Sequence, residues 1–345
     1  MRAVTALAVS VAAIGAAGWL IAGAAGPLRA TRPTGPLAWV TNERAGTVSV
    51  IDTGTNRVIQ TIDVGSRPRG IRLSPDDTTA YVAVSDEGRN TLGTGDAVLA
   101  VDTRTRRTVA RYDAGTDPEQ FAVSPDGRRL FASNEDAGTT SITELASGTV
   151  IATLAVGIEP EGVAISPDGR WVYVTAETSN TVTAIDTTSS QVVRSFMVDP
   201  RPRAAAFSPD GQRAYVSAEI GGSVSIVDVR EHRVLKSVRL PGVAKPVGIA
   251  VSPDGTAVWV ANGHGHSVTL LDRDGGIQRT VPVGQRPWGL ALNEDGTRLY
   301  TANGVSNDVS VVDTQSGAVL ATIPVGDGPW GIAVQKHSSV AGRSR

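Results

Sequence analysis

The chain has 345 residues, of which 41% are hydrophobic and 19% charged, and this length would allow two or three ordinary domains. The formal net charge is −2 and charges of both signs are mixed along the chain, which argues against binding to nucleic acid through a basic surface. The sequence contains no cysteine, so disulfides, thiolate metal sites, a cysteine nucleophile and covalent c-type haem attachment are excluded.

The N-terminus has the pattern of an export segment. Arg2 is followed by an apolar stretch over residues 3–26, and residues 22–24 (Ala-Gly-Ala) offer a cleavage site. A stretch of about 20 apolar residues is also long enough to span a bilayer. We therefore predict a signal peptide or N-terminal membrane anchor over 1–30 and a linker over 31–36. The folded part is expected to be periplasmic or extracellular, with membrane contact only through the N-terminal segment.

The remaining chain is built from seven sequence repeats of about 42 residues. Each repeat is marked by a proline followed by a short apolar run and a polar turn, such as Ser-Pro-Asp-Gly at 124–127. Three further β-branched segments follow, as at 171–175, 224–228 and 319–323 in their respective repeats. The repeat prolines are Pro68, Pro118, Pro160, Pro202, Pro246, Pro287 and Pro329. Four short strands per repeat are typical of a propeller blade.

The two ends of the repeat region complement each other. The chain enters at 37–42 with a second strand that lacks its first, and it ends at 330–334 with a first strand that lacks the other three. Joining them would complete the seventh blade and remove exposed sheet edges. The sequence therefore predicts an all-β, seven-bladed β-propeller over 37–335 whose closing blade is built from both termini, followed by a flexible tail over 336–345.

Two levels of family resemblance are present. Trp-Val-Thr-Asn at 39–42 and Ser-Val-Ile-Asp-Thr at 49–53 resemble the YVTN-type propeller repeat, which covers about 37–335. The strings at 67–71, 159–163, 217–222 and 303–309 resemble the propeller proteins associated with PQQ-dependent catabolism. This second resemblance implies an exported protein linked to PQQ-dependent alcohol oxidation, and it implies no particular reaction.

In a propeller, the loop that enters each first strand and the loop between the second and third strands lie on one face. Charged and aromatic residues flank the repeat prolines or follow the second strands, so they should meet around the channel mouth. We predict a ligand site there composed of Arg67, Arg69, Glu119, Glu161, Arg201, Arg203, Glu219, Arg286, Trp288 and Trp330. Arginine guanidinium groups can bind a carboxylate through two hydrogen bonds, and tryptophan rings can stack on a flat molecule. Such a site suits a planar, small anionic molecule, and PQQ fits that description. The alternative is that these charges pair with each other, for example Arg203 with Glu219.

Other features give weaker functional hypotheses. His264 and His266 lie in a glycine-rich loop on the same face and are candidate metal ligands if carboxylates complete the shell. Residues 86–96 contain the one sizeable insertion, which is a candidate lid or partner contact. The Ser-Pro-Asp-Gly turns are expected on the opposite face, in a structural role.

We predict a binding or accessory protein rather than an enzyme. Its partner would be the small anionic molecule or a periplasmic protein such as a PQQ-dependent dehydrogenase. One alternative is a lactonase-like hydrolase that uses Glu119, Glu161 and the His264/His266 loop. Another is a propeller that carries a haem d1-like cofactor, which would need an axial ligand. Fold by itself decides among none of these.

Overall fold

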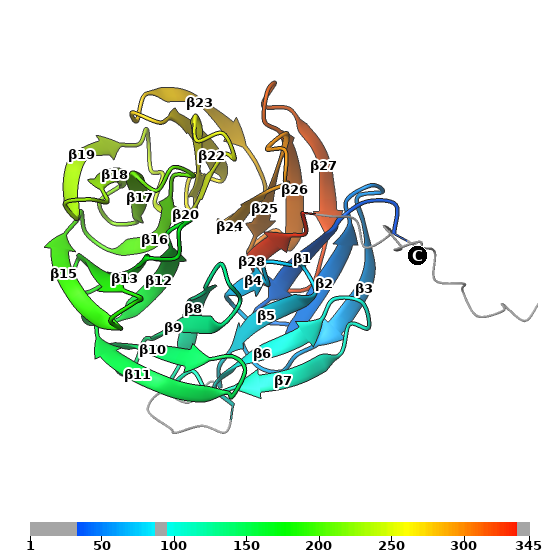
Figure 1. Cartoon of the computed structure of the whole chain (residues 1–345). Coiled ribbons are helices and arrows are strands. Elements are labelled where there is room, and N and C mark those ends of the chain that lie inside the picture. Colours follow the sequence, from blue (N-terminus) through cyan, green and yellow to red (C-terminus); the bar gives the residue numbers. More distant parts are fainter. Residues whose placement is uncertain (1–32, 87–94, 337–345) are drawn as a thin grey trace, which may run out of the picture. The chain divides into compact units, whose positions relative to one another are not determined.

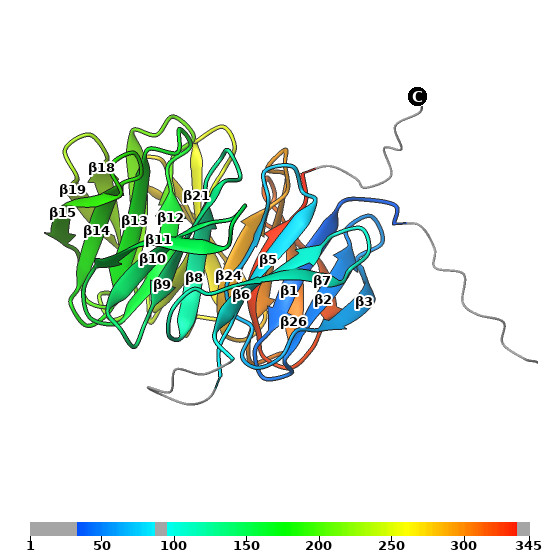
Figure 2. The same ribbon diagram turned by 60° about the horizontal axis from the view of Figure 1, so that its bottom comes forward.

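The computed structural model describes residues 33–86 and 95–336, and every regular element in this part of the chain is a β-strand. The strands form seven four-stranded antiparallel sheets. Figure 1 shows these sheets arranged as blades around a central axis, and Figure 2 shows them from the side. The prediction of a seven-bladed β-propeller is confirmed. No helix in the described residues has the length and apolarity that a membrane crossing requires.

The strands of each blade are named here from the innermost to the outermost. The first blade contains β28 (Pro329–Val334), β1 (Leu37–Asn42), β2 (Thr47–Asp52) and β3 (Arg57–Asp63). The second contains β4 (Ile71–Leu73), β5 (Thr79–Val84), β6 (Ala97–Asp102) and β7 (Thr108–Tyr112). The third contains β8 (Pro118–Val123), β9 (Arg129–Asn134), β10 (Thr139–Glu144) and β11 (Thr149–Ala155).

The remaining four blades repeat this order. The fourth contains β12 (Pro160–Ile165), β13 (Trp171–Ala176), β14 (Thr181–Asp186) and β15 (Gln191–Met197). The fifth contains β16 (Pro202–Phe207), β17 (Arg213–Ala218), β18 (Ser223–Asp228) and β19 (Arg233–Arg239). The sixth contains β20 (Pro246–Val251), β21 (Ala257–Asn262), β22 (Ser267–Asp272) and β23 (Ile277–Pro282). The seventh contains β24 (Pro287–Leu292), β25 (Arg298–Asn303), β26 (Asp308–Asp313) and β27 (Val319–Pro324).

The closing blade is built from both ends of the repeat region, as predicted. The last strand, β28, pairs antiparallel with the first, β1, so that Ala38 lies opposite Val334. Residues just before the first strand also join this blade, because the backbone N–H of Gly35 donates to the Asp52 carboxylate (3.0 Å). The predicted export segment over 1–30 lies outside the described residues and stays a prediction.

The hydrophobic core lies between neighbouring blades. All six residues of β1 are buried, whereas most of the outer strand β15 is exposed. Strands in the middle of a blade are covered on both faces because adjacent sheets pack against each other. For example, Ala38 and Val40 of the first blade share a cluster with Tyr300 and Val311 of the seventh. This packing explains why the small polar residues that alternate with apolar ones on the middle strands are buried as well, as Ser49 of β2 is.

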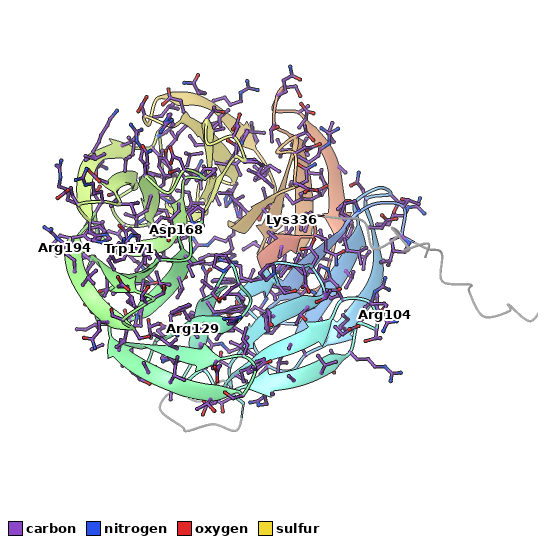
Figure 3. The ribbon with its side chains drawn as sticks, in the orientation of Figure 1. Arg104, Arg129, Asp168, Trp171, Arg194 and Lys336 are labelled. Atoms are coloured by element: carbon purple, nitrogen blue, oxygen red, sulfur yellow. The ribbon has the colours of Figure 1, made fainter. Side chains whose placement is uncertain are left out.

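The Ser-Pro-Asp-Gly turns between the first and second strands stabilise the fold locally. In the third blade the Ser124 hydroxyl donates to the Asp126 carboxylate (2.6 Å), and Gly127 supplies a left-handed backbone with φ of 70°. The same serine–aspartate bond recurs at Asp168 in the fourth blade, a residue labelled in Figure 3. These turns have the structural role that the sequence predicts.

Hydroxyl groups on the second strands connect the inner strands of adjacent blades. Thr175 on β13 accepts a hydrogen bond from the Gly162 N–H (2.8 Å) and donates to the Arg203 carbonyl oxygen of the next blade (3.1 Å). Thr41 makes the corresponding pair of bonds, to the Gly331 N–H (2.8 Å) and the Arg69 carbonyl oxygen (2.7 Å). These bonds fix the inner strands where they carry the predicted mouth residues.

Candidate ligand site at the channel mouth

The residue before each repeat proline adopts a left-handed backbone in all seven blades. Six of these residues are charged, and the seventh is Gly328 with φ of 70°. The six are Arg67 (41°), Asp117 (46°), Glu159 (55°), Arg201 (60°), Lys245 (50°) and Arg286 (57°). This conformation is unfavourable for residues with a Cβ, and a following proline restricts the backbone further. The repeat therefore holds charged side chains in a strained conformation at the entrance of the inner strands.

In most blades the residue after the repeat proline sits in a β-bulge. In the fourth blade Pro160 pairs with Ala176 and Val163 with Val174, so β12 carries one extra residue between them. The same shift occurs at the start of the inner strand in six of the seven blades. A bulge interrupts the ladder and redirects a side chain. Glu161 lies in the bulge of β12 and lines the mouth of the channel.

These two sets of residues surround a cavity of about 1340 Å³ at the mouth. Eight of the ten predicted ligand residues line it, namely Arg67, Arg69, Glu119, Glu161, Arg201, Arg203, Trp288 and Trp330. The other two, Arg286 and Glu219, lie beside it and are joined to each other by an ion pair of 3.2 Å. The lining includes ten carboxylate side chains and five guanidinium groups, so the cavity is acidic in excess.

One group of ion pairs spans the first three blades. Arg69 of the second blade contacts Glu43 of the first (2.8 Å) and forms an ion pair with Glu119 of the third. Arg67, in turn, contacts the Asp117 carboxylate (3.3 Å). Both arginines thus use their donors on carboxylates of neighbouring blades.

A second group joins the fourth and fifth blades. Arg203 contacts Glu161 (2.7 Å) and Glu219 (3.8 Å) and forms a further ion pair with Glu177. Arg201 contacts the same Glu177 (2.7 Å) and Glu219 (3.4 Å). The alternative prediction that the mouth charges pair with each other, as Arg203 does with Glu219, is therefore confirmed. A ligand would meet arginines that are already paired rather than free arginine forks.

Four residues form a floor that separates the mouth cavity from the channel below. Glu161, Arg203, Trp288 and Trp330 line both the mouth cavity and a second cavity of about 60 Å³ inside the channel. The rings of Trp288 and Trp330 stack at 6.2 Å with an interplanar angle of 21°. The guanidinium carbons of Arg203 and Arg286 lie 5.3 Å and 4.2 Å from the Trp288 ring centre. The aromatic surface is thus partly covered by cations.

The lining arginines differ in how far a ligand could reach them. Arg69 and Arg203 have side chains that are 19% and 10% exposed, whereas Arg201 is 45% and Arg44 is 51% exposed. Arg44 contacts Asp327 (2.7 Å). Our predicted set lacks Arg44, although its position in the loop that follows β1 would have placed it on the mouth face.

The glutamates at the mouth are held in an unfavourable environment for negative charge. Burial raises the pKa of Glu135, and the neighbouring carboxylates of Asp117 and Glu161 raise it further. Burial also raises the pKa of Glu161, and the adjacent Arg203 guanidinium opposes this effect. Carboxylate repulsion is therefore only partly neutralised by the arginines.

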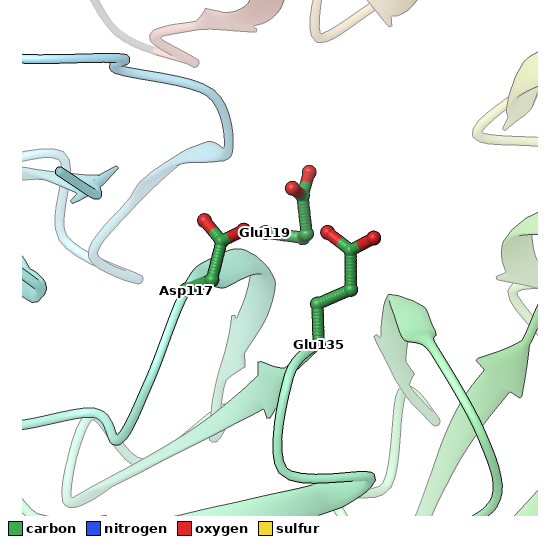
Figure 4. Close-up of side chains that lie close together, drawn as sticks. All are labelled: Asp117, Glu119 and Glu135. Atoms are coloured by element: carbon green, nitrogen blue, oxygen red, sulfur yellow. The ribbon is translucent and has the colours of Figure 1, made fainter. Parts of the chain in front are cut away.

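Three carboxylates of the third blade are close enough to share a cation. Oxygen atoms of Asp117, Glu119 and Glu135 lie within 4.8 Å of one another, and Figure 4 shows their side chains converging. Arg67 and Arg69 already contact this group, Arg67 at Asp117 and Arg69 at Glu119. The guanidinium groups thus supply the positive charge that a metal ion would bring.

The two histidines predicted as metal ligands lie elsewhere. The ring Nδ1 of His266 accepts the backbone N–H of Arg286 (3.1 Å). His264 is exposed, and the partial desolvation of its ring together with the positive charge of Arg286 lowers the pKa of its imidazole. Within the described residues, neither belongs to a group of three or more potential metal ligands. The metal hypothesis stays a prediction.

Most of the insertion that we predict as a lid or partner contact, residues 87–94, lies outside the described residues.

Two family models match parts of the chain. A model described as "Choice-of-anchor I domain" matches residues 36–200, and one described as "Lactonase, 7-bladed beta-propeller" matches residues 197–322. The second match agrees with the β-propeller fold of the structure. The finer resemblance to YVTN-type repeats and to PQQ-associated propellers stays a prediction.

A short stretch is similar to a curated protein. It is 44% identical over 55 residues to the uncharacterized protein YncE of Salmonella typhi, and it covers 16% of each chain. So short a match compares little more than one repeat.

Solved structures share the fold. Hydrazine synthase of Kuenenia stuttgartiensis has a TM-score of 0.72 at 21% identity, with 86% of this chain and 99% of that chain covered. A candidate 6-phosphogluconolactonase from Bacteroides uniformis has a TM-score of 0.72 at 19% identity, with 87% and 99% covered. The dihydro-heme d1 dehydrogenase NirN has a TM-score of 0.64 at 16% identity, with 88% and 77% covered. At such identities the likeness concerns the fold alone.

Proposed function

We propose that this propeller is a binding protein and that the mouth cavity takes a small molecule with an anionic end. The observation that carries the proposal is the set of six charged residues in left-handed conformation before the repeat prolines. Each such residue costs about 1 kcal/mol relative to a relaxed backbone. Gly328 occupies the same position in the remaining blade, so glycine is compatible with the turn. Strain that the repeat could avoid in this way is typical of functional sites.

The charge distribution limits the ligand. Ten carboxylates repel a polyanion, whereas the half-exposed Arg44 and Arg201 are accessible to a single carboxylate or similar group. The stacked Trp288 and Trp330 in the floor would contact a flat or apolar part of the molecule. A ligand with one anionic end and a neutral or cationic remainder therefore fits best. PQQ, a planar molecule with three carboxylates, tests how much negative charge a ligand of the mouth cavity can have.

Thermal unfolding of the full chain tests this proposal. We would compare midpoints with PQQ, small monocarboxylates, amino acids and Ca²⁺. A ligand at about 100 times its dissociation constant adds roughly 2.7 kcal/mol, which gives a clear rise of the midpoint. The rise should be lost in Arg201→Gln and kept in Arg213→Gln, which removes a partly exposed arginine paired with Asp274 (2.6 Å) outside the mouth cavity. A rise that Arg201→Gln leaves intact would place the ligand elsewhere.

We further propose, from the sequence resemblance, that the protein is exported and acts beside a PQQ-dependent dehydrogenase in alcohol catabolism. The mouth would then be the contact surface or would hold a small molecule of that pathway. Co-purification of such a dehydrogenase with the tagged full chain from cells grown on alcohols is the test. Its loss on substitution of Arg201 would assign the contact to the mouth, and its absence would leave only the small-molecule proposal.

Lactone hydrolysis is the second candidate. The lactonase family match over 197–322 favours it, and this region contains Arg203, Glu219 and His264. The lowered pKa of His264 would leave its imidazole neutral near pH 7, as a general base requires. Turnover of simple lactones by purified protein, abolished by His264→Ala, would support an enzyme. Absence of turnover would favour the binding proposal.

A cofactor-carrying propeller is suggested by the likeness to NirN alone. His264, exposed on the mouth face, is the residue that could serve as an axial ligand there. Titration of the full chain with haem, followed by its visible absorption, tests this idea. A shifted absorption band that survives in His264→Ala would exclude His264 as the ligand.

A further inference from the structure

A second charged group lies deeper in the channel, below the floor of the mouth cavity. Arg72, the middle residue of β4, lines the 60 Å³ cavity together with Gln120 of β8. Its side chain is only partly accessible, and it faces the inside of the channel rather than the outer surface. The site is distinct from the proposed ligand site, since neither Arg72 nor Gln120 lines the mouth cavity.

The guanidinium of Arg72 has neutral partners. Its Nη1 donates to the Ile71 carbonyl oxygen (2.8 Å) and its Nη2 donates to Gln120 Oε1 (3.0 Å). No salt bridge within the described residues includes Arg72, in contrast to Arg69 and Arg203 at the mouth. Burial lowers the pKa of Arg72, and no carboxylate offsets this effect. A guanidinium stays protonated under these conditions, so the channel holds a positive charge without a counter-charge.

The carboxylates of the mouth do not supply that counter-charge. Glu161 also lines the lower cavity, but its oxygen is taken up by Arg203 (2.7 Å). The stacked Trp288 and Trp330 complete the floor. An uncompensated charge in a low-dielectric interior is unfavourable, and proteins neutralise it with an ion or a partner.

We infer that the channel binds a small monovalent anion, such as chloride or formate, against Arg72. The remaining guanidinium N–H groups would donate to the anion. Because Gln120 Oε1 accepts from Arg72, its amide nitrogen is left as a second donor at the same cavity. A volume of 60 Å³ has room for a few water-sized groups, which admits a halide or formate and excludes PQQ or a sugar acid.

The direct test is a crystal of the full chain soaked in sodium bromide, with anomalous scattering recorded at the bromine edge. We expect a bromide peak within contact distance of the Arg72 guanidinium. Bromide peaks confined to the outer surface would overturn the inference. This measurement uses the unaltered chain, so it decides the question even if substitution of Arg72 prevents folding.

Thermal unfolding gives an independent test. Sodium chloride or formate should raise the midpoint by about 3 °C over sodium gluconate at equal ionic strength, because gluconate is too large for the cavity. Arg72→Met should remove this difference, whereas Arg213→Met, a matched control outside the channel, should keep it. An equal chloride effect in Arg72→Met would overturn the inference. This inference does not depend on the ligand proposed for the mouth cavity, so it would stand even if no ligand bound there.

Discussion

The two faces of the propeller use the same carboxylate chemistry in opposite ways. On the turn face, the Asp126 carboxylate accepts the Ser124 hydroxyl and the Arg128 backbone N–H, and these bonds lower its pKa. On the mouth face, burial and neighbouring carboxylates raise the pKa of Glu135. Ionised carboxylates therefore stabilise the first face and weaken the second. The difference indicates that the mouth was not optimised for stability alone.

The backbone shows the same contrast. In five of the six turns that join a first strand to a second strand, the left-handed position is a glycine, as at Gly127, where this conformation is least unfavourable; in the second blade it is Asp77. The position before the repeat proline, on the mouth face, carries a charged residue in six of the seven blades. Within a repeat, the stabilising turn and the charged mouth residues therefore lie at opposite ends of the inner strand.

The largest effect is expected from removal of the central arginine of the mouth. Arg203→Met would take from buried Glu161 the arginine with which it pairs and would leave Glu177 and Glu219 to Arg201, and it should destabilise the fold by about 3–5 kcal/mol. Urea unfolding measures this loss. Arg170→Met on the turn side, where the side chain is 60% exposed, should change stability by less than about 1 kcal/mol. Similar losses of stability in Arg203→Met and Arg170→Met would refute the difference between the two faces.

A smaller loss is expected from a single turn. Asp126→Ala removes the bonds from the Ser124 hydroxyl and the Arg128 N–H, and should cost about 1 kcal/mol in urea unfolding. Asp126→Asn keeps a side-chain oxygen as an acceptor and should lose less. An equal loss in both variants would mean that the charge, rather than the hydrogen bonds, stabilises the turn.

Relief of strain at the mouth should be stabilising. Lys245 has a φ of 50°, so Lys245→Gly should raise the unfolding free energy by about 0.5 kcal/mol after the greater chain entropy of glycine is counted. Lys245→Ala keeps the Cβ and should give no such gain. If both variants were equally stable, the left-handed conformation would not be a source of strain.

The smallest effect concerns pH. A lowered folded pKa means that Asp126 contributes stability above its unfolded pKa, and this is lost as the pH falls through the folded value. The raised folded pKa of Glu135 has the opposite sign, since its ionised form destabilises the fold and protonation at falling pH removes that effect. Glu135→Gln should therefore be more stable than the unaltered chain at pH 7 and nearly equal to it at pH 4. Urea unfolding midpoints of the two proteins at pH 7 and pH 4 test this prediction. A Glu135→Gln variant that is less stable than the unaltered chain at pH 7 would contradict it.

The sequence by itself determined the fold, the closing blade and the face on which the mouth residues lie. These follow from local repetition, because the proline, the turn and the three β-branched segments recur in each unit and every unit folds alike. The positions of Arg203 and Trp288 relative to their own prolines were therefore sufficient to assign both to the mouth.

Only the tertiary structure decided which charges meet. Arg203 pairs with Glu161 and Glu177 of the preceding blade, and Trp330 from the end of the chain stacks on Trp288 of the seventh blade. Arg72 was left without a carboxylate by the same arrangement. Such contacts depend on the angle between blades and on closure of the ring, which bring together residues from different repeats. A local sequence pattern contains the positions of these residues within their own blades but not the distances between blades.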